Sequence, residues 1–185
     1  SYHINQDDIG LQDDLTLSAI KALVDNGRIV MKNPRDYEAR AAIMLASTFA
    51  CVDILHLGSG CDPTSHRLEH ELSAIYDVTH GVGLGIILPA QLRYLYKGAP
   101  ARFAKFGRVV FGIGETDDEK AALMSIDALE QFIRELGMPT HLSEIGIGDE
   151  HFEEMADKVL RDYGPFGDIH IFDKESIVEL FRLCL

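Results

Sequence analysis

Apolar residues recur at intervals of three and four along most of the chain, the spacing of one face of an α-helix. The first such stretch begins at Leu11. Its apolar positions then follow four residues apart: Leu15, Ala19 and Leu23. Asparagine and glycine commonly follow the last residue of a helix. The pattern therefore predicts an amphipathic helix that ends at Asn26-Gly27.

A second helix is predicted from Asn33-Pro34 onwards. Asparagine is a favoured N-cap, and proline is favoured at the first helical position. The apolar positions continue on one face as far as Leu55, and two glycines, Gly58 and Gly60, follow. We expect one long helix that ends at these glycines.

The same start signal recurs at Asp62-Pro63 and predicts a third helix, which extends to about Tyr76. His66 and His70 lie within it, four residues apart. Residues at this spacing share one face of a helix. We therefore expect both imidazoles on the same side.

The run after His80 is apolar on nearly every side, as in a helix that is buried all round. A buried strand would read similarly, but the run continues to about Tyr96, and this length favours a helix. Gly81 and Gly85 would allow another backbone or a ligand to approach closely. Pro89 is expected to bend the helix.

Four more helices follow from apolar spacing and end signals. They are Ala99 to Phe111, a helix capped by Thr116 and Glu119 and ended by Gly137, a helix capped by Asp149 and ended by Gly164-Pro165, and Ile177 to Leu183 after Asp173 and Ser176. No alternating strand pattern is evident. The expected fold class is all-α, a compact bundle of about eight helices that forms a single domain over residues 1–185.

The charge balance narrows the range of partners. The chain carries 17 basic and 30 acidic residues, a formal net charge of −13. Nucleic acid and anionic membrane surfaces would repel such a chain, so neither is expected as a partner. The most apolar run is far shorter than the roughly 20 residues that span a membrane.

The cysteines indicate a reducing compartment. Cys51, Cys61 and Cys184 are odd in number and lack metal-site spacing, so a disulfide framework is not expected. We expect a cytoplasmic protein, with Cys51 as a small core residue. Because the chain begins without methionine, we also expect further sequence before Ser1.

Three of the eight histidines fall within fifteen residues: His66, His70 and His80. A transition-metal site needs imidazole nitrogens that converge at about 2 Å from one ion, and a pair spaced by four on a helix provides two of them. Such pairs also occur by chance on solvated faces. His80 favours a metal site, because it adjoins an apolar, glycine-rich helix in which a solvated histidine is not expected.

Other residues near these histidines allow weaker interpretations. Gly81, Gly83 and Gly85 do not form a dinucleotide loop, because a helix rather than a strand precedes them. Three nearby carboxylates could orient imidazoles or simply lie on a solvated face: Glu69, Glu71 and Asp77. The other histidines are expected to be surface or capping residues: His3, His56, His141, His151 and His170.

The motif H-x3-H-E-L-S-A-x-Y-D-x-x-H-G-x-G-L, which starts at His66, resembles the iron-containing (group III) alcohol dehydrogenases, in particular their butanol-dehydrogenase-like branch. Several other segments resemble the same branch, and together they cover nearly all of the chain: Leu11 to Asp13, Asn33 to Arg40, Arg102 to Ala104 and Leu142 to Ile147. The resemblance implies the C-terminal helical domain of such an enzyme, a dehydroquinate synthase-like fold.

The resemblance also implies a chemistry. His66 and His80 match two histidine ligands of a divalent metal, iron or zinc, and His70 matches a histidine near the nicotinamide and substrate that handles protons. The metal polarises an alcohol oxygen, and hydride passes to NADP or NAD. The cofactor would be bound by an N-terminal α/β domain, the substrate is a small alcohol or aldehyde, and a homodimer is expected.

Two departures from the family pattern matter. The D-x3-H motif that supplies the aspartate and the first histidine is not present, so the chain is expected to be a fragment that is inactive and binds metal weakly on its own. Cys61-Asp62-Pro63 replaces a Gly-Asp-Trp-like turn. A non-catalytic helical binding or scaffold module, derived from that domain, is the alternative. An apolar face at Gly81 to Leu88 would favour pairing with the absent half or with a second copy.

Overall fold

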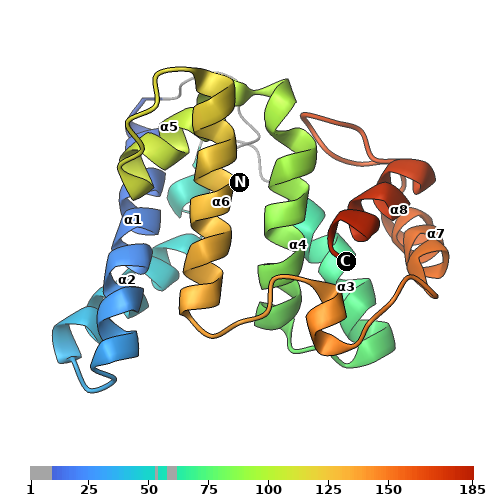
Figure 1. The fold of residues 1–185 in the computed structure, drawn as a ribbon, viewed down its shortest axis with the longest axis horizontal. Helices are drawn as coiled ribbons and strands as arrows, with labels where there is room; N and C mark the ends of the chain where they lie inside the picture. The colour runs from blue at the N-terminus through green and yellow to red at the C-terminus, as the bar shows by residue number, and fades with distance from the viewer. Residues whose placement is uncertain (1–9, 53, 58–61) are drawn as a thin grey trace. The chain divides into compact units, whose positions relative to one another are not determined.

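The computed structural model describes residues 10–52, 54–57 and 62–185, and these residues form eight α-helices (Figure 1). The helices are α1 (Leu11–Lys32), α2 (Tyr37–Cys51), α3 (Thr64–Tyr76), α4 (His80–Leu95), α5 (Pro100–Phe111), α6 (Asp118–Glu135), α7 (Phe152–Tyr163) and α8 (Lys174–Leu183). Short 3-10 turns lie at Ile54–His56, Tyr96–Gly98 and Leu142–Ile145. The only extended pairing within the described ranges is a single bridge between Phe166 and Phe172. The all-α prediction is confirmed.

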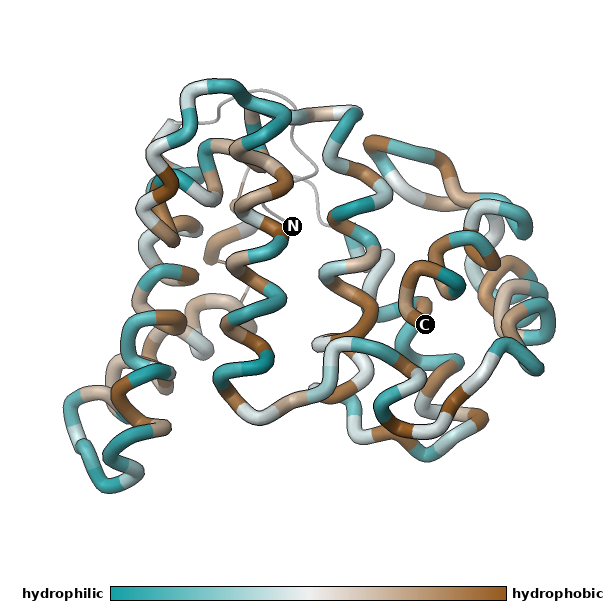
Figure 2. The backbone as a smooth tube through the Cα atoms, viewed as in Figure 1, coloured by the Kyte–Doolittle hydropathy of each residue, from teal (hydrophilic) through white to brown (hydrophobic). Residues whose placement is uncertain are grey.

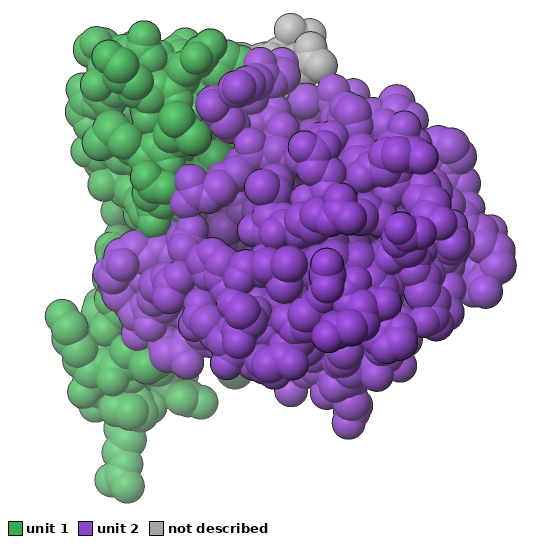
Figure 3. Space-filling model, turned by 45° about the vertical axis from the view of Figure 1, so that its right-hand side comes forward, with its two compact units in different colours: residues 1–61, 99–128 green, residues 62–98, 129–185 purple. Residues whose placement is uncertain are grey.

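The chain divides into two compact units, coloured separately in Figure 3. The first unit comprises residues 1–61 and 99–128, and the second comprises residues 62–98 and 129–185. In the first unit, α1 packs against α2 and α5. In the second unit, α3 packs against α4 and α7, and α8 packs against α4 and α7. The three predicted histidines all fall in the second unit.

The first unit combines an apolar core with one buried ion pair. Its helices α1, α2 and α5 turn apolar residues toward one another, and the brown segments of Figure 2 mark these residues along the chain. Buried members include Leu17, Val24, Ala39, Phe103 and Phe106. Among them lie Asp13 and Arg102, which are 1% and 4% exposed. A buried charge is tolerated when an opposite charge and hydrogen bonds accompany it, as they do here.

Helix α4 supplies much of the core of the second unit. Ile86 and Ile87 have no exposed surface, and Leu92 and Leu95 are also buried. The predicted helix, rather than a strand, is therefore present from His80 onwards, and Pro89 lies inside it. On the other side of this core, Phe152 of α7 stacks on Phe181 of α8 at a centroid distance of 5.4 Å.

The predicted end of the first helix is wrong. Helix α1 continues through Asn26 and Gly27 to Lys32. The side-chain amide of Asn26 donates to the carbonyl of Ala22, one turn back, instead of ending the helix. A glycine inside a helix costs only about 1 kcal/mol relative to alanine, and the packing of α1 against α2 outweighs this cost.

The predicted start of the second helix is also wrong, by three residues. Asn33 is the C-cap of α1, and Asp36 is the N-cap of α2, where its carboxylate accepts from the backbone N–H of Ala39 at 3.0 Å. Helix α2 ends at Cys51, before Leu55. Cys51 is exposed, so the expectation that it lies in the core is wrong as well. Residues 58–61, with the two glycines expected to end this helix, lie outside the described residues.

The remaining helix ends show which side chains act as caps. Asp173 and Ser176, which were predicted to start the last helix, form a capping box at the beginning of α8, and Gly112 follows α5 with a φ of 71°. Helix α6, in contrast, is capped by Asp117, whose carboxylate accepts from the N–H of Lys120 at 2.9 Å. The predicted capping box of Thr116 and Glu119 does not form. The helix begins at Asp118, so its N-cap is Asp117, one residue after Thr116.

Helix α7 also begins differently from the prediction. His151, not Asp149, occupies its N-cap position, and no side-chain capping bond is made there. The backbone carbonyl of Asp149 accepts from the N–H of Phe152 at 3.3 Å. Gly164 ends the helix as expected, with a φ of 65°.

In the stretch Gly81 to Leu88, Gly83, Ile86 and Ile87 are buried within the second unit, whereas Val82, Leu84 and Leu88 are partly exposed, so the expected apolar surface stays a prediction. Large exposed apolar side chains instead concentrate on α1 and α2: Leu11, Leu15, Ile29, Met31, Tyr37, Met44, Leu45 and Phe49. Among the described residues, no helix has the length and apolar character needed to cross a membrane.

Candidate metal centre

Two neighbouring helices bring the three predicted histidines together. His66 and His70 lie on α3, and His80 is the first residue of α4. The connection between these helices is short because Asp77 ends α3 in the left-handed conformation, with a φ of 53°. The chain therefore turns back at once and carries His80 alongside the first two histidines.

The three imidazoles form a compact triangle. Their ring centroids are separated by 6.3 Å for His66 and His70, 5.2 Å for His66 and His80, and 5.8 Å for His70 and His80. One candidate ligand atom from each of them lies within 4.8 Å of the others, and all three residues are exposed. The i, i+4 spacing thus has the expected effect on α3, and the turn adds the third histidine.

The donor set fits a first-row transition metal. Imidazole nitrogen is a usual ligand of zinc, iron, nickel and copper. Because a zinc–nitrogen bond is about 2.0–2.1 Å long, two ligand nitrogens of one ion lie no more than ~4.2 Å apart. Nitrogens that already lie within 4.8 Å of one another need only small side-chain movements to reach that separation.

The environment of His66 favours the neutral imidazole that a metal requires. Burial lowers the pKa of His66 below its usual value of 6.5, and the nearby imidazoles of His80 and His70 lower it further. The carboxylate of Glu69 opposes these effects in part. Partial burial and clustering together keep the His66 side chain uncharged over a wider range of pH.

A buried carboxylate lies directly behind His80. Glu69, on α3, has no exposed surface, and its Oε2 contacts Nδ1 of His80. Its other oxygen, Oε1, accepts from the hydroxyl of Ser73. The same hydroxyl lies 2.7 Å from the carbonyl of Val78, in the turn that leads to α4. One acidic side chain therefore links both helices and their connection.

Gly83 leaves the space that the Glu69 carboxylate occupies. A Cβ at position 83 would lie 2.7 Å from both Cγ and Oε1 of Glu69, closer than real side chains approach. By contrast, a Cβ at Gly81 would meet no atom of the described residues within 4 Å. A close approach was predicted for Gly81 and Gly85, but it lies at Gly83, where the partner is a side chain. A Cβ at Gly85 would lie 3.4 Å from its nearest neighbour, Cε of Met138, which is an ordinary contact.

The flanks of the histidines on α3 are also held in place. The guanidinium of Arg67 lies over the rings of Tyr163 and Phe166, at 4.7 Å and 5.0 Å from their centroids. The hydroxyl of Ser65 donates to the side chain of Gln91, which is buried on α4. The residues on either side of His66 therefore fix the orientation of this turn of α3.

The family motif contains Ser73 and Gly83 but gives them no role, and Arg67 stands at one of its variable positions. From the sequence, Glu69, Glu71 and Asp77 were alike as possible partners of the imidazoles, and the structure shows that they differ in burial. Only Glu69 is buried, whereas Glu71 is partly exposed and Asp77 is exposed at the end of α3. No local pattern in the sequence distinguishes Glu69 from the other two carboxylates, because packing against α4 determines which side of α3 is buried.

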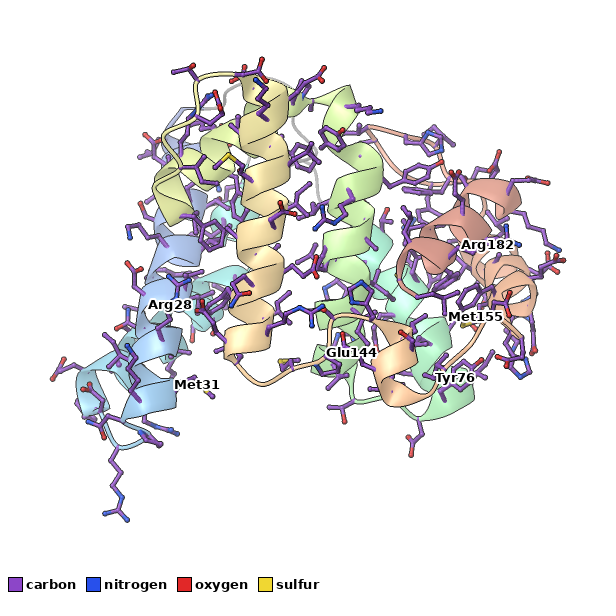
Figure 4. The ribbon with its side chains drawn as sticks, in the orientation of Figure 1. Arg28, Met31, Tyr76, Glu144, Met155 and Arg182 are labelled. Carbon is purple, nitrogen blue, oxygen red and sulfur yellow. The ribbon has the colours of Figure 1, made fainter. Side chains whose placement is uncertain are left out.

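The scattered histidines of the second unit lie apart from this triangle. His141 contacts Glu144 at 3.2 Å in the connection between α6 and α7, and Figure 4 labels Glu144 there. His151 contacts Glu154 at 2.9 Å and lies edge-on to Tyr76, at the end of α3. His170 packs between Tyr94 and Phe172. His3 and Cys61 lie outside the described residues.

Comparison with known proteins identifies the class. The family model described as "Fe-containing alcohol dehydrogenase family, C-terminal" matches residues 1–185, and the chain belongs to this family. The resemblance inferred from the histidine motif is thereby confirmed.

Particular relatives agree. The chain is 34% identical to NADH-dependent butanol dehydrogenase A of Clostridium acetobutylicum over 185 residues, which is 98% of this chain and 48% of the relative. It is 30% identical to the NADPH-dependent aldehyde reductase YqhD of Escherichia coli, over 82% of this chain and 39% of the relative. The chain spans about half the length of the curated relatives that it matches.

Solved structures show the same fold. The crystal structure of NADH-dependent butanol dehydrogenase A from Thermotoga maritima superposes with a TM-score of 0.88 at 29% identity, covering 95% of this chain and 46% of that one. The structure of YqhD from Escherichia coli gives a TM-score of 0.90 at 27% identity, over 96% and 46%. The all-helical fold of this chain is that of their corresponding halves.

Proposed function

We propose that the chain is the metal-side helical domain of an NAD(P)-dependent alcohol dehydrogenase or aldehyde reductase. The observation that carries this proposal is the triangle of His66, His70 and His80, formed by one family motif on α3 and α4. Family membership supports the class of reaction, and the named relatives act with NADH or NADPH. Residues 1–185 then form one metal-binding domain, and a preceding α/β domain would hold the nicotinamide.

His66 and His80 are the proposed metal ligands, and His70 is the proposed catalytic residue next to the nicotinamide and the substrate. A bound iron or zinc ion would supply a Lewis acid that polarises the substrate oxygen. His70 lies within the same triangle, and its exposed imidazole is accessible to a substrate. In this proposal, His70 holds or releases the proton that is exchanged when an aldehyde becomes an alcohol.

The remaining features of the enzyme are proposals of the same kind. The substrate would be a small alcohol or aldehyde, and the protein would act as a cytoplasmic homodimer. Cys51 and Cys184 are both free, which supports a reducing compartment. The exposed apolar side chains of α1 and α2 support association with the preceding domain or with a second subunit.

The test measures alcohol-dependent reduction of NADP and NAD by the full-length protein, with metal content determined in parallel. We expect His80→Ala to abolish turnover and to lower the bound iron or zinc. The matched control is His151→Ala, which removes an imidazole of similar exposure that lies outside the triangle. Unchanged activity in His80→Ala would contradict the proposal and would favour a non-catalytic binding or scaffold module.

A further inference from the structure

We propose that Glu69 is the residue that positions His80, and that Gly83 is required for it to do so. This inference rests on the proposed metal site and names a function for two residues outside the triangle of histidines. Its basis is an arrangement of three residues: a fully buried carboxylate, an imidazole in contact with it, and a glycine that leaves room for both.

The contact selects one tautomer of His80. A carboxylate only accepts hydrogen bonds, so the Nδ1 that faces Glu69 must carry the proton. In a neutral imidazole the other nitrogen, Nε2, then holds the lone pair. Nε2 is therefore the atom that His80 offers to a cation, and without Glu69 the proton would be free to move between the two nitrogens. A histidine ligand that donates its second N–H to a carboxylate is fixed in both tautomer and ring orientation.

Burial argues that this contact does more than stabilise the fold. Removing a carboxylate from water is costly, and replacing a buried ionic contact by well-packed apolar residues is often neutral or even stabilising. Glu69 has no exposed surface, whereas the side chain of His80 is 50% exposed. The chain thus retains a buried carboxylate, which is unfavourable for stability, next to one accessible imidazole. The effect of this carboxylate is to fix the position of that imidazole.

The surrounding residues fix the carboxylate from two sides. The Ser73 hydroxyl reaches both Oε1 of Glu69 and the carbonyl of Val78, and its single proton can serve one of them at a time. On the other side, the hydrogen atoms of Gly83 face Cγ and Oε1 of Glu69, where a methyl group would overlap them. The carboxylate therefore cannot rotate or move away from His80 unless α3 or α4 also moves.

The test uses the 185-residue chain and two measurements. Nuclear magnetic resonance of the imidazole nitrogens in the metal-free protein reports the tautomer of His80, and calorimetric titration with Ni²⁺ alone reports the affinity of the triangle. We expect the wild-type His80 to carry its proton on Nδ1. Glu69→Met, which keeps an unbranched side chain but removes the acceptor, should mix the tautomers and weaken Ni²⁺ binding by roughly 10–100-fold.

Three further variants separate positioning from folding. Glu69→Gln keeps an acceptor oxygen, so it should retain the tautomer and lose less affinity than Glu69→Met. Gly83→Ala should displace the carboxylate and reproduce the loss, whereas Gly81→Ala, which adds the same methyl group to open space on the same helix, should change neither measurement. Circular dichroism identifies any variant that does not fold. If Glu69→Met is such a variant, the comparison of Gly83→Ala, Gly81→Ala and Glu69→Gln decides whether Glu69 positions His80.

The outcomes distinguish this inference from the proposed function. If the wild type binds Ni²⁺ and both Glu69→Met and Gly83→Ala leave the tautomer and the affinity unchanged, the positioning role is overturned while the metal site stands. If the wild type binds no Ni²⁺ but its tautomer responds to Glu69→Met, the positioning role stands, and the metal content of the full-length protein decides on the metal site. A wild-type His80 that carries its proton on Nε2 overturns the inference directly.

Discussion

Arg102 of α5 donates to both carboxylate oxygens of Asp13 on α1, with 2.8 Å between Nη2 and Oδ1, and the two side chains are only 5% and 2% exposed. Lys105 lies 3.7 Å from the same carboxylate. The negative charge of Asp13 therefore compensates two cations between α1 and α5.

Asp13→Asn should lower the free energy of unfolding by about 3–5 kcal/mol, because it leaves buried positive charge without its counter-charge. Urea denaturation measures this change. The double variant Asp13→Leu with Arg102→Met should recover most of the loss. Asp25→Asn is the control, since its pair with Lys21 is about half exposed and should contribute no more than ~1 kcal/mol. Equal losses in the two single variants would contradict the assigned role of burial.

Gly107→Ala should destabilise the contact between α5 and α6. An added Cβ would lie 1.7 Å from Oγ and 2.7 Å from Cβ of Ser125, and 2.8 Å from Cδ1 of Ile113. Such overpacking typically costs about 1–3 kcal/mol, which thermal unfolding will show. Adding Ser125→Ala should restore only part of the loss, because the Cβ remains. Gly114→Ala, with no described neighbour within 4 Å, is expected to be neutral.

The metal-free protein should show His66 titrating below pH 6.5, because burial and the neighbouring imidazoles of His80 and His70 lower its pKa. In the pH interval between the folded and unfolded pKa values, the unfolded chain binds more protons, so stability falls as pH decreases through that interval. Nuclear magnetic resonance measures the titration directly. His80→Ala removes one of the imidazoles that lower the pKa of His66 and should therefore raise it, and a pKa at or above 6.5 in the wild type would contradict the assignment.

Cys184 should resist modification until the protein unfolds. Burial raises the pKa of its thiol from 9.0 to about 12, and the thiolate is the reactive form. With Cys51 and Cys61 replaced by serine, a thiol reagent at pH 8 should label the native protein slowly and the urea-unfolded protein rapidly. Rapid labelling of the native protein would show that Cys184 is accessible.

The same thiol gives a pH dependence of stability. Between pH 9 and about 12 the unfolded chain loses the proton of Cys184 while the folded chain keeps it, so stability falls as pH rises through this window. Cys184→Ala should remove this component of the slope. Parallel stability curves for the wild type and the variant would show that the thiol is not the cause.

The sequence predicted the helices and the histidines better than it predicted their supports. His66 and His70 needed only the period of one helix, and apolar spacing was sufficient to place them. Glu69 could not be distinguished from Glu71 or Asp77, since the inward face of α3 depends on how α4 packs against it. The continuation of α1 through Gly27 has a similar cause, because its packing against α2 is non-local and outweighs a local stop signal.

Because Glu69 and Gly83 approach each other closely, the residues at these two positions are expected to vary together. A methyl group at position 83 excludes the carboxylate, and the carboxylate excludes the methyl group. A family member with a small residue in place of Glu69 would have room for a side chain in place of Gly83, whereas a member with the acid is expected to have glycine there. Substitution of only one of the two residues would leave His80 poorly positioned. We therefore expect positions 69 and 83 to have changed together during evolution.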